Sequence, residues 1–314
     1  MEEFNTKIDL VCEGGGVKGI GLLGAICCLE EKGYTFERFA GTSAGAIASA
    51  FLAVGYTGSE MKEILFNVNL KSLLDRNIIS YLPIIGENFN LLMKKGIFSG
   101  NAIEKYLKSK FAKKNKTKFK DISINGVSPL KIIATDVTKR QLLILPDDLI
   151  NYNINPMEFE ISKAVRMSIS LPFYFNPVIL NYGKDSSYIV DGGVLSNYPI
   201  WLFDTNSKPR WPTFGLKLVS NKDLTFTSPN KSTVLSYSID IIDTLLSKDE
   251  EIYINNKDLI RTINIPTFNI KTTDFLISKN DMERLFNSGY NAANQFLKTW
   301  NFEKYISKYR SSSA

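Results

Sequence analysis

Two short motifs in this chain hold side chains that could act as a nucleophile and a base, and glycines frame both. Ser43 stands at the centre of the first, GTSAG, which has the pattern G-x-S-x-G and falls between an expected strand and an expected helix. A nucleophile elbow needs this setting, because a tight turn between small residues lifts the serine hydroxyl above the sheet. The motif alone also allows a simpler role, in which Ser43 only caps the following helix.

The base for such a serine cannot be histidine, because the 314 residues include none. This excludes Ser-His-Asp triads, Cys-His proteases and His-ligated zinc sites. Acid–base chemistry must then use a carboxylate, lysine, tyrosine, cysteine or water, and a carboxylate in a suitable setting is Asp191 in YIVDGGV, which ends an expected strand just before Gly192 and Gly193. Burial there should raise the pKa of Asp191 towards neutrality, where a carboxylate becomes an effective base. Aspartate before glycine is also a common turn, so this motif too leaves a structural role open.

A third motif, GGGVKG at residues 14–19, offers backbone N–H groups. Glycines let the chain turn sharply, so successive N–H groups point into one concavity that stabilises a phosphate or the oxyanion of acyl transfer. The motif also matches G-x-G-x-x-G, which would indicate a dinucleotide-binding oxidoreductase. That fold needs an acidic residue about 20 positions on, at the end of the second strand. Here that strand ends in FAGTSAG and Glu37 precedes its core, which disfavours the nucleotide alternative.

The elements that position these motifs alternate between strands and helices. Short apolar runs predict six strands, at 8–12, 36–40, 130–135, 142–145, 188–190 and 214–219. Apolar residues at helical spacing predict helices over 18–32 and 44–54. This alternation is typical of an α/β fold with a mostly parallel sheet, in which sites form where strands end. After residue 225 the pattern is mainly helical, most clearly over 240–247 and 282–300.

Taken in order, EGGGVKG, GTSAG and VDGGVLSNYP resemble the motif set of the patatin-like phospholipase family, and connecting segments such as IIATDVTKRQLLIL resemble it too. The resemblance covers about residues 8–220 and implies a three-layer α/β/α sandwich. It leaves 221–314 as a mostly helical C-terminal extension, which we expect to pack on the same domain. Two residues depart from the usual pattern: Glu13 stands where aspartate is frequent, and Lys18 where arginine is frequent.

The resemblance implies a lipid acyl hydrolase of the phospholipase A or lysophospholipase type that works through an acyl-enzyme. Ser43 is then the nucleophile and Asp191 its base, while the N–H groups of Gly15, Gly16 and Val17 form the oxyanion hole. The other motif residues support the site: Gly14, Lys18, Gly19, Gly41, Gly45, Gly192 and Gly193. No cofactor and no metal are implied. Alternatives are an acyltransferase, a neutral-lipid lipase, an effector phospholipase that needs an activator, and a catalytically silent binding protein.

Other residues with chemical potential fit structural roles. Asp136 also ends an expected strand, but nothing in its context supplies a catalytic partner. The three cysteines fall on expected buried elements, where they pack as small apolar side chains: Cys12, Cys27 and Cys28. Two apolar stretches, 60–97 and 171–180, are candidates for an acyl-chain channel or a lid, with ordinary core packing as the alternative.

Charge is unevenly distributed along the chain. Residues 94–120 hold ten lysines and one acid, a local charge of +9 that leaves −3 for the rest of a chain whose net charge is +6. One basic segment on a mildly acidic protein argues against a nucleic-acid binder. The segment is either a solvated face or a contact with anionic lipid headgroups, where each lysine contributes about 1 kcal/mol. The expected partners are a phospholipid or lysophospholipid substrate and a membrane surface, with an activator or an oligomer left open.

The N-terminal sequence MEEFNTKIDLVCEGGG is acidic and lacks a charged-then-apolar leader. The sequence has no run of ~18 apolar residues, the length that indicates a membrane-spanning helix. Three clustered cysteines fit a reducing compartment rather than a disulfide framework. We therefore expect a cytoplasmic protein that is peripheral at membranes.

Overall fold

An eight-stranded sheet forms the centre of the protein, and the computed structural model describes residues 6–75, 95–220, 244 and 256–309. The strands of this sheet are β1 (Lys7–Cys12), β2 (Thr35–Thr42), β4 (Leu130–Asp136), β5 (Gln141–Leu145), β7 (Val178–Tyr182), β8 (Asp185–Asp191), β9 (Thr213–Val219) and β10 (Thr262–Pro266). Their order across the sheet is β10-β9-β1-β2-β4-β8-β7, and β5 pairs with β4. A separate small sheet joins β3 (Gly96–Phe98) to β6 (Phe173–Phe175).

Most of the central sheet is parallel, as the sequence predicts for an α/β fold. The neighbours β10, β9, β1, β2 and β4 run parallel, whereas β5, β8 and β7 join antiparallel. Both faces of β1 are buried, which is typical of a parallel strand. Its residues Ile8 and Leu10 belong to the main core, and Val11 packs on the opposite face in a smaller cluster with Tyr198.

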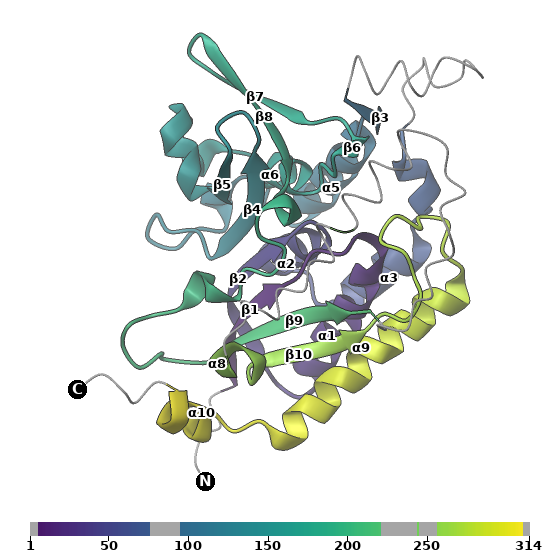
Figure 1. Cartoon of the computed structure of the whole chain (residues 1–314), viewed down its shortest axis with the longest axis vertical. Coiled ribbons are helices and arrows are strands. Elements are labelled where there is room, and N and C mark those ends of the chain that lie inside the picture. The colour runs from purple at the N-terminus through teal and green to yellow at the C-terminus, as the bar shows by residue number, and fades with distance from the viewer. Residues whose placement is uncertain (1–5, 76–94, 221–243, 245–255, 310–314) are drawn as a thin grey trace.

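Helices flank the sheet, as Figure 1 shows. They are α1 (Ile20–Glu31), α2 (Ala44–Ala53), α3 (Gly58–Asn67), α5 (Asn101–Lys113), α6 (Ile161–Ser168), α8 (Asn256–Leu259), α9 (Lys279–Thr299) and α10 (Phe302–Tyr309). Helix α1 is buried between the sheet and α9, and glycines bring the two helices into backbone contact. A Cβ on Gly24 would lie 1.9 Å from the Phe286 carbonyl oxygen, and one on Gly289 would lie 1.8 Å from that of Gly21.

The C-terminal region completes the sheet as well as covering it. Strand β10 pairs with β9, and α9 confirms the helix predicted over 282–300. Strand β10 is not predicted from the sequence, because its five residues, TINIP, are too short a pattern to stand out in a mainly helical region. Of the helix predicted over 240–247, only residue 244 lies within the described residues.

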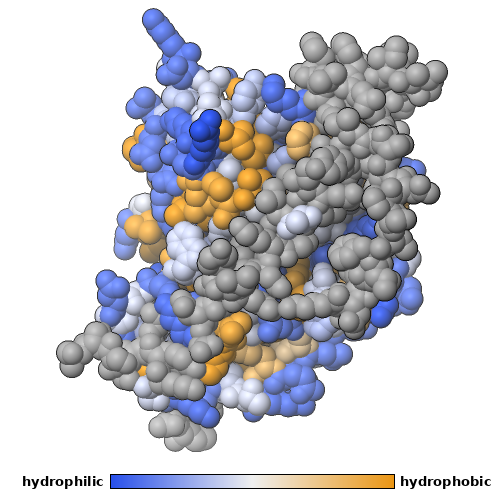
Figure 2. Space-filling model, viewed as in Figure 1, coloured by the Kyte–Doolittle hydropathy of each residue, from blue (hydrophilic) through white to orange (hydrophobic). Residues whose placement is uncertain are grey.

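None of the described helices is both long enough and apolar enough to cross a bilayer. Figure 2 shows hydrophobic side chains gathered over β7 and β8 on an otherwise mainly hydrophilic face. Ile179 on β7 and Leu195, just after β8, are each 52% exposed.

Strand β4 brings together two segments that are distant in sequence. Residues of β2 pair with the first half of β4, and Thr42 lies opposite Ile133. Residues of β8 pair with the second half, and Asp191 lies opposite Ala134. Because Ile133 and Ala134 are adjacent, the end of β2 and the end of β8 meet at the middle of β4.

Candidate active site

Ser43 occupies a tight turn between β2 and α2. Its backbone lies in the left-handed region, with φ 51° and ψ −118°, a conformation that non-glycine residues adopt mainly at functional sites. The flanking glycines are required by space: a Cβ on Gly45 would lie 2.1 Å from the Cys12 carbonyl oxygen, and one on Gly41 would lie 2.3 Å from the Gly45 backbone. The geometry is that of a nucleophile elbow.

A second serine holds this turn in place. The Ser43 N–H donates to Ser168 Oγ at 2.9 Å, and the Ser168 hydroxyl donates to the Ile133 carbonyl oxygen at 2.6 Å. Ser168 is fully buried at the end of α6, so it links the turn to β4. Ser168 is not predicted from the sequence, because nothing in the run RMSIS distinguishes it from a packing serine.

Asp191 ends β8 beside Ser43, with its carboxylate buried. Its Oδ1 accepts the Gly193 N–H at 2.8 Å. Its Oδ2 is buried and has no hydrogen bond of ordinary geometry within the described chain. Burial raises the pKa of Asp191 to about 7, and the Gly193 N–H and the Ser43 hydroxyl act in the opposite direction. The side chain thus has the protonation behaviour of a base that works near neutral pH.

The glycine-rich segment 14–19 passes directly beside Ser43. A Cβ on Gly14 would lie 3.3 Å from Ser43 Cβ, and one on Gly19 would lie 2.7 Å from Ala44 Cβ. Two hydrogen bonds tie the segment to Asn197: the Gly14 N–H donates to its carbonyl oxygen at 3.0 Å, and its side-chain amide donates back to the Gly14 carbonyl at 3.1 Å.

The donors of this segment divide into two groups. Within the described chain, the N–H groups of Gly15 and Gly16 have no acceptor, whereas the Val17 N–H donates to the Thr272 carbonyl oxygen at 3.1 Å. The family resemblance implies three oxyanion donors, and this contact leaves two of them open, the N–H groups of Gly15 and Gly16. Lys18 donates to Ser220 Oγ at 3.0 Å, which connects the glycine-rich segment to the residue that follows β9.

The remaining motif glycines also lie where backbone contact is close. A Cβ on Gly192 would lie 2.3 Å from the Ile133 carbonyl oxygen, and Gly193 supplies the N–H that binds Asp191. Asp136 lies elsewhere, where its carboxylate accepts the Tyr152 hydroxyl at 2.6 Å and the N–H groups of Thr138 and Lys139. These contacts are compatible with the structural role that the sequence suggests for Asp136. All three cysteines are buried and free, in agreement with packing roles.

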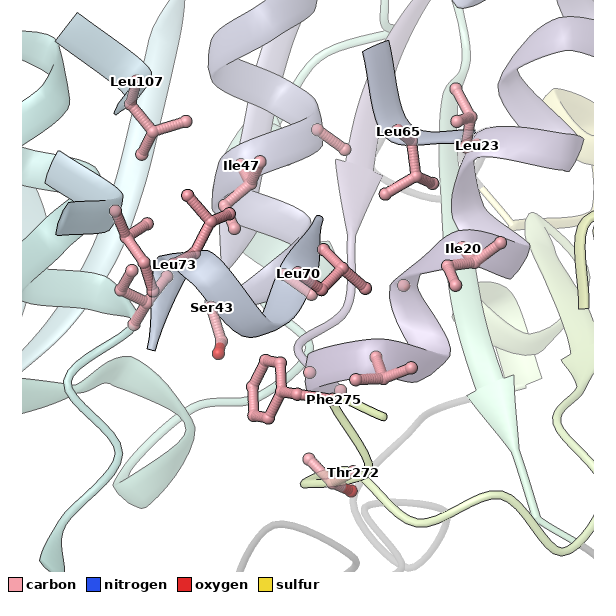
Figure 3. A pocket seen from close by; sticks show the side chains of 18 of the residues that line it. Ile20, Leu23, Ser43, Ile47, Leu65, Leu70, Leu73, Leu107, Thr272 and Phe275 are labelled. Atoms are coloured by element: carbon pink, nitrogen blue, oxygen red, sulfur yellow. The ribbon is translucent and has the colours of Figure 1, made fainter. Parts of the chain in front are cut away.

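Ser43 and Asp191 open into an apolar cavity of about 220 Å³. Its walls come from α1, α2, α3, α5 and the 3₁₀ turn Leu70–Leu73. Figure 3 shows Ser43 with these apolar side chains on one side and with Phe275 and Thr272 on the other. The apolar stretch 60–97 contributes six lining residues: Met61, Ile64, Leu65, Val68, Leu70 and Leu73. Residues 76–94 of that stretch lie outside the described residues, and Leu171 and Phe175 come from the second stretch.

Comparison with known proteins identifies the family. The family model for patatin-like phospholipase matches residues 10–204. Uncharacterized protein YqhO of Bacillus subtilis (strain 168) is 36% identical over 298 residues, which cover 94% of this chain and 99% of that protein. Probable lipid hydrolase 463L of Invertebrate iridescent virus 6 is 29% identical over 194 residues, or 61% of each chain.

The fold also resembles a solved structure. VipD from Legionella pneumophila superposes with a TM-score of 0.56 at 18% identity, covering 93% of this chain and 67% of VipD. At that identity the likeness concerns the fold alone. The family match spans both Ser43 and Asp191, and the 463L relative is described as a lipid hydrolase. The chain therefore belongs to the patatin-like phospholipase family and is, at the level of that family, a lipid acyl hydrolase.

Proposed function

We propose that this protein is a phospholipase A or lysophospholipase in which Ser43 is the nucleophile and Asp191 the general base. The observation that carries the proposal is a buried carboxylate, with a pKa of about 7, beside a serine elbow at the wall of an apolar cavity. A fatty-acyl ester suits this combination, because its chain fills the cavity while its carbonyl reaches the serine. The many apolar side chains around Ser43 favour a long chain over a small polar acyl group.

In the first half of the reaction, Ser43 Oγ attacks the ester carbonyl carbon and its proton passes to Asp191 Oδ2. The carbonyl oxygen becomes an oxyanion, which the N–H groups of Gly15 and Gly16 stabilise. Each such donor typically contributes about 2.7–4 kcal/mol to transition-state binding. When the tetrahedral intermediate collapses, the ester C–O bond breaks and the leaving alcohol takes the proton from Asp191.

In the second half, water attacks the acyl-enzyme. Asp191 accepts a proton from the water, the same two N–H groups hold the second oxyanion, and collapse returns the proton to Ser43 Oγ as the fatty acid leaves. One carboxylate therefore serves as base and then acid in each half, a role that requires a pKa near neutrality.

The proposal is tested by fatty-acid release from mixed phospholipid and lysophospholipid vesicles. Ser43→Ala and Asp191→Asn should each abolish release by the wild-type protein. Asp136→Asn is the matched control, since Asp136 is another fully buried aspartate at a strand end but contacts Tyr152 instead of Ser43. Circular dichroism of each variant shows whether the fold is retained.

The outcomes separate the alternatives. Release that survives both substitutions would discard the dyad. Transfer of the acyl group to an added alcohol in preference to water would indicate an acyltransferase, and cleavage confined to triacylglycerol would indicate a neutral-lipid lipase. If vesicles are not cleaved but a fluorophosphonate probe labels Ser43, the protein is an enzyme that awaits an activator. Neither cleavage nor labelling would indicate a binding protein.

A further inference from the structure

The loop between β10 and α9, residues 267–278, lies beyond the segment 10–204 that matches the family model. Three of its residues nevertheless line the cavity that contains Ser43: Thr272, Thr273 and Phe275. We call this segment the β10–α9 loop. Its start is fixed to the sheet, because the buried Thr267 donates its N–H to the Val219 carbonyl oxygen at 2.8 Å.

The β10–α9 loop contacts the glycine-rich segment through its backbone. The Thr272 carbonyl oxygen accepts the Val17 N–H at 3.1 Å. The same oxygen would lie 2.2 Å from a Cβ on Gly16, whose φ is +53°. Only glycine suits that position, because it adopts the left-handed conformation and leaves room for the carbonyl. The loop is therefore anchored next to the two N–H groups that remain open.

Phe275 extends from the same loop towards the nucleophile. Its ring stacks on Tyr174, with centroids 5.5 Å apart and an angle of 26°, and Tyr174 packs in turn on Phe98 at 4.9 Å. In Figure 3 the Phe275 ring lies on the side of Ser43 away from Ile47. The next residue, Leu276, does not line the cavity and is 72% exposed. Adjacent apolar residues thus have opposite environments.

We infer that the β10–α9 loop is a specificity element of the active site, and that Phe275 limits the bulk of the acyl group that can reach Ser43. The inference rests on the proposed function for its substrate class, fatty-acyl esters. The chains selected are straight ones, because a branch on the carbon next to the carbonyl must lie close to Ser43 and so meets the stacked ring. Because Tyr174 stacks on the Phe275 ring, the ring cannot easily move to make room for a branched chain. Close-packed side chains accommodate additional atoms only at an energetic cost.

The test compares p-nitrophenyl esters of a straight fatty acid and of the same acid with a methyl branch next to the carbonyl. Phe275→Ala should raise the ratio of kcat/KM for the branched ester to that for the straight ester by about tenfold or more. Phe275→Trp should lower this ratio. Leu276→Ala is the matched control in the same loop, and the ratio should stay at the wild-type value.

An unchanged ratio in both Phe275 variants would overturn the inference, as would an equal change in Leu276→Ala. If thermal unfolding shows that Phe275→Ala does not fold, Phe275→Leu decides in its place, since it keeps an apolar side chain but loses the ring. A second measurement needs no catalysis: straight and branched fatty acids compete with a fluorescent fatty acid for wild type and for Phe275→Ala. Altered discrimination with neither hydrolysis nor fluorophosphonate labelling of Ser43 would support the loop's role and refute the proposed function. Hydrolysis that needs Ser43, together with unaltered discrimination, would support the proposed function and refute the loop's role.

Discussion

Asp191 differs from the other buried aspartate at a strand end, Asp136, in how few hydrogen bonds its carboxylate accepts. Burial raises its pKa to about 7, and the carboxylate has one firm hydrogen bond, from the Gly193 N–H. The buried Asp136 accepts three hydrogen bonds through its carboxylate, from Tyr152, Thr138 and Lys139. A carboxylate left with an open oxygen can accept a proton, whereas one whose oxygens are both engaged serves the fold.

The pH dependence of the reaction follows from this pKa. Because Asp191 must be ionised to accept the Ser43 proton, kcat/KM should rise with pH and reach half its maximum near pH 7. Initial rates on an uncharged ester from about pH 5 to about pH 9 measure it. A rate that is flat over this range, or that falls with rising pH, would contradict the role of Asp191 as base.

The same pKa predicts an effect on stability. Between about pH 4 and about pH 7 the folded protein keeps the Asp191 proton that the unfolded chain has lost, so the free energy of unfolding falls as pH rises through that window. Asp191→Asn removes the buried charge and should stabilise the protein by about 2–4 kcal/mol at about pH 8, with little effect at about pH 4.

Urea unfolding of wild type and Asp191→Asn at the two pH values checks this. Asp136→Asn is the control, and it should destabilise the protein at the higher pH, because an amide nitrogen in place of Oδ2 cannot accept the Tyr152 hydroxyl. An Asp191→Asn variant that is less stable than wild type at about pH 8 would show that the carboxylate is held in place for structural reasons.

At the scale of elements, the site depends on how α6, β4 and the elbow are joined. Ser168 accepts the Ser43 N–H and donates to the Ile133 carbonyl, so one hydroxyl connects all three. Positive φ at Ser43 is strained, and a strained turn keeps its geometry only when its surroundings fix it. We regard Ser168 as a positioning residue that acts through Ser43.

Ser168→Ala should therefore lower kcat by roughly 10- to 100-fold, as misplaced catalytic groups do. It should also lower the free energy of unfolding by about 1–3 kcal/mol, because two buried backbone groups lose their partner. Ser162→Ala is the control on the same helix: Ser162 is buried too, but its hydroxyl has no hydrogen-bond partner within the described residues. Equal effects of the two substitutions on kcat would refute the role of Ser168.

On the scale of the whole molecule, folding changes the meaning of the lysine-rich segment 94–120. Its charge as a stretch of sequence is +9, but acids from other segments pair with several of its lysines. Lys108 lies 2.6 Å from Glu160, Lys114 lies 2.8 Å from Glu60, and Glu158 accepts from both Lys118 and Lys120 at 2.8 Å. The segment is thus less basic in the folded protein than in the chain.

This distribution makes the proposed contact with anionic lipid testable at the level of individual lysines. Lys105 and Lys113 are exposed on α5 and have no ion pair in the described chain. Their double substitution by serine should weaken binding to anionic vesicles at low salt by about 2 kcal/mol, roughly 30-fold. The double substitution of Lys118 and Lys120 changes the net charge equally but should weaken binding less. Equal losses would point to net charge alone, and no loss in either would leave α5 a solvated face.

Local patterns in the sequence determined the chemistry of the site. The motif around Ser43 predicts its turn because only small residues fit a strand that reverses into a helix, and the structure contains that turn. The absence of histidine directs attention to Asp191, and YIVDGGV predicts a strand end there. These inferences depend on interactions between residues that are close together in the chain, so the residue types in a short motif are enough to predict them.

Only the tertiary structure determined which distant residues complete the site. Thr272 and Phe275 stand 229 and 232 positions from Ser43 by residue number, and no local pattern marks them. From the sequence, Ser168 is interpreted as a packing serine. Its role becomes apparent only in the fold, where its hydroxyl donates to the Ile133 carbonyl oxygen of β4. The pKa of Asp191 and the pairing of the lysines depend on which groups the fold buries or brings into contact. These effects arise from packing between residues that are distant in the chain. They therefore cannot be predicted from the pattern of neighbouring residues.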